Sequence, residues 1–147
     1  MASIIEKIRI FLKAVKILRN WYLFPITYFK LTKKETVIFE TKKGTKLKIR
    51  VRSTDLMALT NIWLVEEYKK KEFELKNNDV IIDIGGHIGL FSLYAAEKCK
   101  LGKIFTYEPI KENFELLKEN IKINNIKNIF PENIAVSNNK SKVTIFL

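Results

Sequence analysis

Cysteine and histidine are scarce in this sequence of 147 residues, which contains one of each, Cys99 and His87. A single thiol cannot form a disulfide within the chain, so nothing in the sequence points to an oxidising compartment. We interpret Cys99 as a buried structural residue, because no cationic neighbour and no metal-ligand spacing surrounds it. The sequence therefore predicts no metal site.

Long apolar runs are also missing. No stretch of about 18 uncharged apolar residues occurs, so we expect no helix that spans a membrane. Lysine or arginine interrupts the first 20 residues five times, which leaves no apolar segment of the kind that a secretory signal needs. An apolar fraction of 47% and a charged fraction of 29% are typical of a globular protein, and we expect a cytoplasmic one.

Acidic residues are scarce only in the first third of the chain. Residues 1–54 contain 14 lysines and arginines against three acidic residues, whereas residues 55–147 contain 13 of each kind. The whole net charge of +11 therefore lies in the first part. This asymmetry predicts a basic N-terminal extension, residues 1–54, followed by a neutral globular region, residues 55–147.

A helix and a β-hairpin are predicted in the basic extension. Apolar residues recur at helical spacing through residues 3–20 and form one stripe: Ile4, Ile8, Phe11, Val15, Leu18 and Tyr22. Alternating apolar residues over 36–51, with a turn at Lys43 and Gly44, predict the hairpin. A further helix, capped by Ser53 or Thr54, is predicted to extend to about Tyr68.

Three interpretations of the basic helix remain open. Packing of its apolar stripe on the rest of the protein ranks first, because such stripes usually face a core. Peripheral membrane contact through residues 3–29 ranks second, since Trp21, Tyr22 and Phe24 suit a bilayer interface. Nucleic-acid binding ranks last, because the basic residues do not form a recognisable binding motif.

Strands and helices alternate in the second region. The apolar run VIIDI reads as a strand buried on both faces, and the later elements follow the βαβ order of a parallel sheet. We predict strand 80–84, helix 88–98, strand 103–108, helix 111–123, a strand around 129–136 and an antiparallel strand 143–147. The sequence thus predicts an α/β fold with right-handed crossovers.

Three of the five glycines, Gly85, Gly86 and Gly89, follow the first predicted strand directly. Ligands of doubly wound sheets bind outside the carboxyl ends of the strands, where this segment falls. Glycines allow the backbone to turn sharply and to approach a ligand closely. Asp83, at the end of the strand, is placed where its charge can meet solvent or a cation. These residues therefore predict a cofactor site rather than a packing feature.

The glycine spacing selects among cofactors. The dinucleotide pattern G-x-G-x-x-G fails in either register, because His87 or Ile88 stands where the second glycine is required. The Asp83 carboxylate would repel a pyrophosphate but suits the ammonium and sulfonium groups of S-adenosylmethionine. Glu108, 25 residues after Asp83 at the end of the second strand, is placed to accept hydrogen bonds from ribose hydroxyls.

Several segments together resemble the FkbM-type S-adenosylmethionine-dependent methyltransferases. They are RSTDLMALTNIWLVEEY, VIIDIGGHIGLFSLYAA, FTYEPIKENFELLKENIKINN and NIAVSNNKSKVTIFL, within residues 45–147. The resemblance implies a Rossmann-like class I methyltransferase sheet. This chain would contain its first three parallel strands, and the sheet would be incomplete.

The resemblance also implies which residues bind the cofactor. They are the glycine segment with its acid and the ribose acid, joined by two positions near the adenine: Asp83, Gly85, Gly86, Gly89, Glu108, Asn133 and Ala135. His87 is interpreted as a solvent-facing loop residue, and the sequence identifies no catalytic base. Members of the family continue into a fourth parallel strand with another acidic motif, so we expect an N-terminal piece of a longer enzyme.

The function implied by the resemblance is methylation of a hydroxyl on a sugar, glycan or small molecule. Two other hypotheses remain. A nicotinamide-dependent oxidoreductase is disfavoured by the glycine spacing. A non-enzymatic membrane-associated or interaction module would follow if the chain is complete as it stands.

Overall fold

The computed structural model describes residues 3–68 and 74–138. The chain divides into two compact units, Met1–Leu75 and Lys76–Leu147, and each is described by itself. The border between the units follows Leu75, whereas the charge pattern alone placed a border after residue 54. The helix that begins at Asp55 lies within the first unit, which accounts for this difference.

Two helices open the first unit. Helix α1 (Ile4–Ile17) begins with a capping box, in which the Glu6 N–H donates to Ser3 Oγ and the Ser3 N–H to the Glu6 carboxylate. Helix α2 (Leu23–Tyr28) follows after a short turn. Within the predicted apolar stripe, Leu18 is fully buried, whereas Ile4, Ile8 and Tyr22 are exposed. The described residues therefore do not bear out the packing interpretation for the first half of α1.

The predicted β-hairpin is confirmed. Strands β1 (Thr36–Glu40) and β2 (Lys46–Arg50) are antiparallel, and they pair Val37 with Ile49 and Phe39 with Leu47. All four of these side chains are buried on one face. Gly44 in the turn has φ +96°, a conformation that favours glycine over other residues.

The third helix belongs to the first unit because a buried ion pair fixes its start to the hairpin. Helix α3 (Asp55–Leu59) continues into a π-helical turn, η1 (Thr60–Leu64), and the predicted helix therefore ends four residues before Tyr68. The Asp55 carboxylate is fully buried and accepts the Nε and Nη2 groups of Arg50, each at 2.9 Å. Ser53 Oγ accepts the Asp55 N–H, whereas the Thr54 side chain makes no capping bond.

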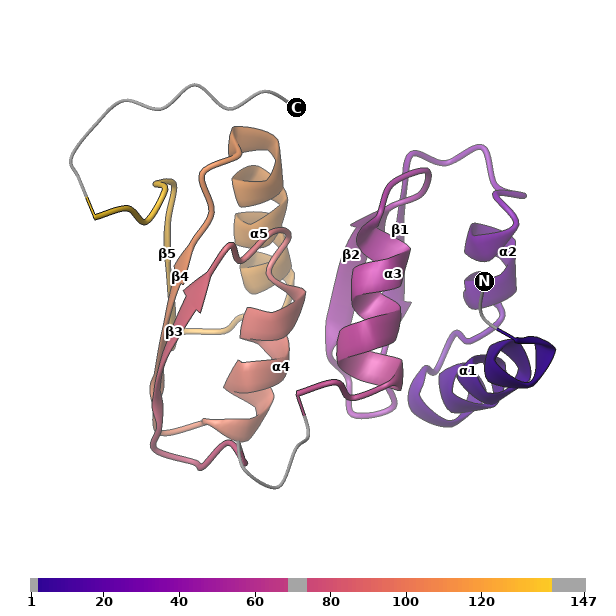
Figure 1. Ribbon diagram of the computed structural model, residues 1–147, viewed down its shortest axis with the longest axis horizontal. Helices are drawn as coiled ribbons and strands as arrows, with labels where there is room; N and C mark the ends of the chain where they lie inside the picture. The colour runs from indigo at the N-terminus through magenta and orange to yellow at the C-terminus, as the bar shows by residue number, and fades with distance from the viewer. Residues whose placement is uncertain (1–2, 69–73, 139–147) are drawn as a thin grey trace. The chain divides into compact units, whose positions relative to one another are not determined.

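The second unit confirms the predicted βαβ order (Figure 1). Its three strands are parallel and lie in the order β3-β4-β5. The elements are β3 (Val80–Ile84), α4 (Leu90–Lys98), β4 (Lys103–Tyr107), α5 (Lys111–Ile123) and β5 (Ile129–Glu132). The predicted strand at 143–147 lies outside the described residues. Cys99, at the end of α4, is buried as expected, and burial raises the pKa of its thiol.

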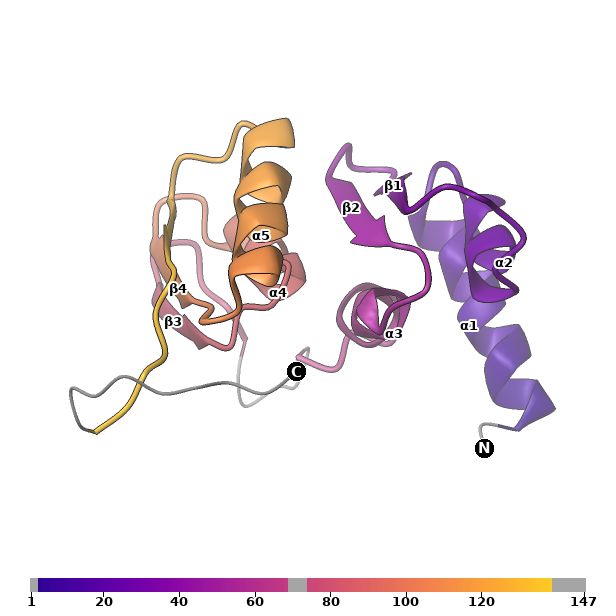
Figure 2. The same cartoon turned by 90° about the horizontal axis from the view of Figure 1, so that it is seen from above.

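Both helices of the second unit lie on the same face of its sheet, as Figures 1 and 2 show from two directions. On the other face Val80, Ile82 and Ile84 are 67%, 65% and 63% exposed. The prediction that this strand is buried on both faces is therefore wrong for the described part of the chain. Alternate residues of β3 face the helices, and one of them is Asp83.

None of the helices in residues 3–68 and 74–138 combines the length and the apolar character needed to cross a bilayer.

Candidate cofactor site

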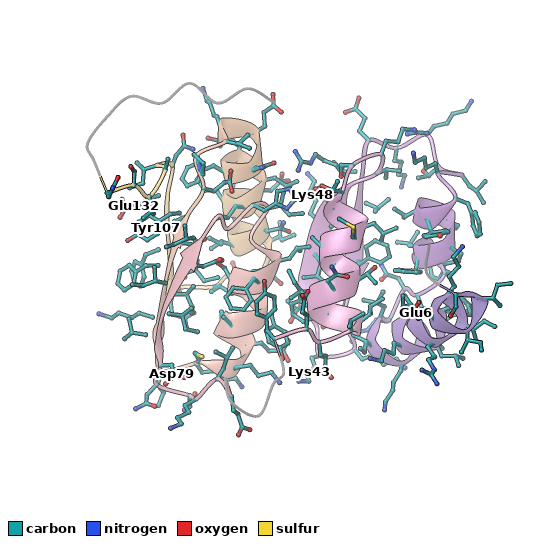
Figure 3. The ribbon with its side chains drawn as sticks, in the orientation of Figure 1. Glu6, Lys43, Lys48, Asp79, Tyr107 and Glu132 are labelled. Atoms are coloured by element: carbon teal, nitrogen blue, oxygen red, sulfur yellow. The ribbon has the colours of Figure 1, made fainter. Side chains whose placement is uncertain are left out.

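The candidate site lies at the carboxyl ends of the parallel strands. Asp83 of β3 is in register with Thr106 of β4, and Tyr107 of β4 is in register with Glu132 of β5. Figure 3 shows Tyr107 and Glu132 at this end of the sheet, with Asp79 at the opposite end. The loop after β3 and the turn after β4 therefore meet at one edge, as the predicted topology requires.

The glycine loop is held by the backbone of β4. The N–H groups of Gly85 and Gly86 both donate to the Tyr107 carbonyl, at 2.9 and 3.0 Å. Gly85 and Gly89 have φ angles of +78° and +83°, which side chains disfavour. At Gly86 the constraint is space, because a Cβ atom there would lie 2.1 Å from Thr106 Oγ1. The three glycines thus allow a loop conformation that other residues would strain.

Glu108 joins the glycine loop to the turn after β4. Its side chain is only 4% exposed. One carboxylate oxygen accepts the His87 N–H and the other accepts the Ile110 N–H, both at 2.8 Å. Asn113 Nδ2 approaches the second oxygen at 3.5 Å. Glu108 therefore holds the loop in place in addition to any role toward a ligand.

Asp83 lies beneath helix α4 and not in solvent, which corrects the expectation that its charge meets water. Its carboxylate accepts hydrogen bonds from Ser92 Oγ at 2.6 Å and from Thr106 Oγ1 at 3.3 Å. Burial raises the pKa of Asp83, the two hydroxyl donors oppose the rise, and the negative charge of Glu108 adds to it. Because Thr106 is in register with Asp83 and lies two residues before Glu108, both acids lie at the same end of the sheet.

Two further predicted residues follow β5. Asn133 Nδ2 donates to the carbonyls of Glu108 and Pro109, at 2.7 and 3.1 Å, so Asn133 joins the same edge of the sheet. Ala135 lies two residues farther along and is exposed. The role of Asn133 and Ala135 near the adenine stays a prediction. His87 is half-buried, with φ +51°, and its backbone is tied to Glu108.

Three polar residues of the site carry no signal in the sequence. Ser92 and Thr106 hold the Asp83 carboxylate, and both are fully buried. Asn120 is also fully buried, and its Nδ2 donates to the Ile88 carbonyl at 2.9 Å. Each lies on a helix or strand where a polar side chain normally faces water, so only the three-dimensional arrangement identifies them. Within the described residues, no group of three or more His, Cys, Asp or Glu could hold a metal ion.

A parallel sheet, a glycine loop and two acidic strand ends define the class of the second unit as a Rossmann-like, class I methyltransferase fold. The chain belongs to the TRM5/TYW2 methyltransferase domain family, whose model matches residues 38–144. The expected methyltransferase domain is confirmed at this level. The resemblance to the FkbM type is not, because the matching family is a different one.

Two relatives of known name are similar to shorter stretches of the chain. A methyltransferase of Sordaria araneosa, sdnD, is 40% identical over 50 residues, which are 34% of this chain and 19% of that protein. The tRNA(Phe) (4-demethylwyosine(37)-C(7)) aminocarboxypropyltransferase of Methanocaldococcus jannaschii is 31% identical over 67 residues, 46% of this chain and 27% of that protein.

A solved structure shares the fold. The crystal structure of M. jannaschii TYW2 in complex with AdoMet has a TM-score of 0.52 and 26% identity. The similarity covers 68% of this chain and 43% of that one. This chain thus matches less than half the length of each of these relatives.

Proposed function

We propose that this protein binds S-adenosylmethionine at the carboxyl ends of β3 and β4 and transfers a group from it. The observation that carries the proposal is the convergence of Asp83, the glycine loop and Glu108 at one edge of the sheet. Membership of the methyltransferase domain family supports it, and so does the AdoMet complex of a relative with the same fold.

The residues of the site suit this cofactor chemically. S-adenosylmethionine carries a sulfonium and an ammonium group, which nearby carboxylates favour. A carboxylate oxygen that already accepts one backbone N–H has further lone-pair capacity, so Glu108 can accept a ribose hydroxyl as well. Methyl transfer breaks the sulfur–methyl bond, forms a bond from the methyl carbon to the acceptor atom, whose proton passes to water, and leaves S-adenosylhomocysteine with an uncharged sulfur. Such a displacement depends mainly on alignment of the reacting atoms.

We propose tRNA as the acceptor. The matching family and the named activity of the M. jannaschii relative support a tRNA acceptor, and no finding supports the expected sugar or glycan hydroxyl. These findings also weigh against the expectation that nucleic acid is the least favoured partner of the basic N-terminal helix. The β1–β2 hairpin offers cationic side chains for a phosphate backbone, and Lys43 at its turn and Lys48 on β2 are labelled in Figure 3.

Calorimetric titration of the full chain with S-adenosylmethionine tests cofactor binding. We expect saturable binding that NAD does not reproduce. Gly85→Ala should weaken it about tenfold or more, because the left-handed loop conformation is strained with a side chain. Gly44→Ala is the matched control, since Gly44 also has positive φ and open space around it. Equal binding by both variants, or binding of NAD alone, would refute the cofactor proposal.

Label transfer tests the acceptor and the transferred group. The chain is incubated with total tRNA and S-adenosylmethionine labelled either at the methyl carbon or at the carboxyl carbon. Methyl transfer moves only the methyl label into tRNA, whereas aminocarboxypropyl transfer moves only the carboxyl label. Incorporation into a polyol or glycan fraction instead of tRNA would reject the tRNA acceptor and leave the cofactor proposal standing.

A further inference from the structure

An open apolar groove lies within the first unit, whereas the candidate cofactor site belongs to the second unit. It has a volume of about 730 Å³ and is bordered by α1, α2 and α3 with η1. Its lining includes Ile8, Phe11, Phe24, Phe29, Leu56 and Met57. Several of these side chains are largely exposed to solvent: Phe29 is 66% exposed, Met57 61% and Ile8 54%. Water therefore contacts a large apolar surface that the core of the unit does not use.

The apolar surface extends from the groove along the first half of α1. Ile4, Ile5 and Leu12 are exposed on this helix, and they neighbour Ile8 at spacings of three and four residues. The capping box of Ser3 and Glu6 begins the helix at Ile4, so these residues lie on a formed helix. Figures 1 and 2 show α1 and α2 as neighbours, and Figure 3 labels Glu6 on α1.

Basic residues lie on the same helix as this apolar surface. Lys7, Arg9, Lys13 and Lys16 are exposed on α1, and Glu6 is its one acidic residue. The wider segment 1–54 carries the whole charge excess of the chain. An occupant of the groove must therefore combine a large apolar surface with negative charge.

We propose that the groove and the exposed face of α1 dock on an anionic phospholipid bilayer. Acyl chains supply the apolar surface, and phosphate headgroups supply the negative charge next to the lysines. An RNA would place phosphates and water against the apolar lining, so the apolar side chains would not be removed from water. A small apolar ligand would leave Ile4 and Ile5, at the start of α1, in water. Trp21 and Tyr28 are also exposed in this unit, and both side chains suit the headgroup level.

Flotation of the full chain with lipid vesicles tests this proposal. Vesicles of phosphatidylglycerol and phosphatidylcholine in equal parts should bind it, and vesicles of phosphatidylcholine alone should bind it much less. The double variant Ile8→Gln with Met57→Gln should lower the partition coefficient about tenfold or more, because two apolar side chains no longer enter the bilayer. Both residues are exposed, so the variant should fold.

The matched control is Ile82→Gln, which makes the same change at a similarly exposed residue of the second unit. It should bind vesicles as the unaltered chain does, and S-adenosylmethionine titration should be unchanged in the Ile8/Met57 variant. The proposal is overturned if no vesicle binds, if both vesicle types bind equally, or if both variants lose binding equally. It is also overturned if the groove variant affects only tRNA binding or only self-association measured by light scattering.

Discussion

The two units of this protein differ in how many polar side chains they bury and in where these side chains lie. The described part of the first unit buries three polar side chains, Thr27, Thr41 and Asp55, and exposes a row of apolar residues on α1. The described part of the second unit buries six polar side chains, all on or near the glycine loop: Asp83, Ser92, Thr106, Glu108, Asn113 and Asn120. Burying a polar group costs free energy unless the group is hydrogen-bonded. In the second unit, the buried polar groups gather where a ligand is proposed to bind.

Loss of the buried ion pair in the first unit should lower the stability of the protein most. Arg50→Met leaves the fully buried Asp55 carboxylate without its cationic partner and should cost about 3–5 kcal/mol of unfolding free energy. Arg19→Met, which breaks the more exposed pair with Glu40, should cost about 0–1 kcal/mol. Urea denaturation followed by tryptophan fluorescence measures both, because Trp21 and Trp63 lie in the first unit.

The same variant tests whether the two units unfold independently. If the cofactor site is a property of the second unit alone, Arg50→Met should keep its S-adenosylmethionine affinity at urea concentrations where the tryptophan fluorescence shows that its first unit has unfolded. A loss of affinity in step with the fluorescence change would show that the two units unfold together.

The next effect concerns the closest packing in the glycine loop. Gly86→Ala places a methyl group against Thr106 Oγ1 and should cost about 1–3 kcal/mol, together with loss of cofactor binding. Thr106→Ala in the same chain removes the clashing oxygen and should restore part of the stability. Far-ultraviolet circular dichroism in urea measures this recovery. An alanine at Gly86 that binds the cofactor normally would mean that the loop does not need this approach to β4.

Each unit also contains an asparagine whose side chain hydrogen-bonds to a distant part of the backbone. Replacing these two asparagines by alanine should lower the free energy of unfolding by different amounts. Asn120→Ala leaves the Ile88 carbonyl unpaired in a buried place and should cost about 1–3 kcal/mol. Asn20→Ala releases the Ile38 carbonyl and the Glu40 N–H near the surface, and should cost about 0.5–1.5 kcal/mol. Chemical denaturation of both variants compares them directly. A larger cost at Asn20 would contradict the role assigned to burial.

The smallest expected effect is a pH dependence of stability. Burial raises the pKa of Asp83 above its usual value of 3.8, so the folded state holds this proton more tightly than the unfolded state. The contribution of protonated Asp83 to the free energy of unfolding is therefore complete below its usual pKa, and it is lost as the pH rises through the raised pKa. Asp83→Asn should remove this loss of stability with rising pH, and it should also weaken cofactor binding. Denaturation at a series of pH values checks it, and identical pH profiles of variant and unaltered chain would contradict it.

The element order of the described residues and the position of the glycine loop follow from the sequence because they depend on local patterns. Helix α5 has the predicted bounds, and the glycine loop follows the predicted strand. The exposure of Ile82 could not be predicted, because an apolar run looks the same whether one face of a sheet is covered or both. The burial of Asp83 was also missed, since it depends on Ser92 and Thr106, which approach it from other elements.

The shared hydrogen bonds of Glu108 have a consequence for slow motions of the second unit. Because one carboxylate accepts the N–H groups of both His87 and Ile110, the loop after β3 and the turn after β4 should open together rather than separately. Amide hydrogen exchange at these two positions should then have similar protection factors, and both should rise when the cofactor occupies the site.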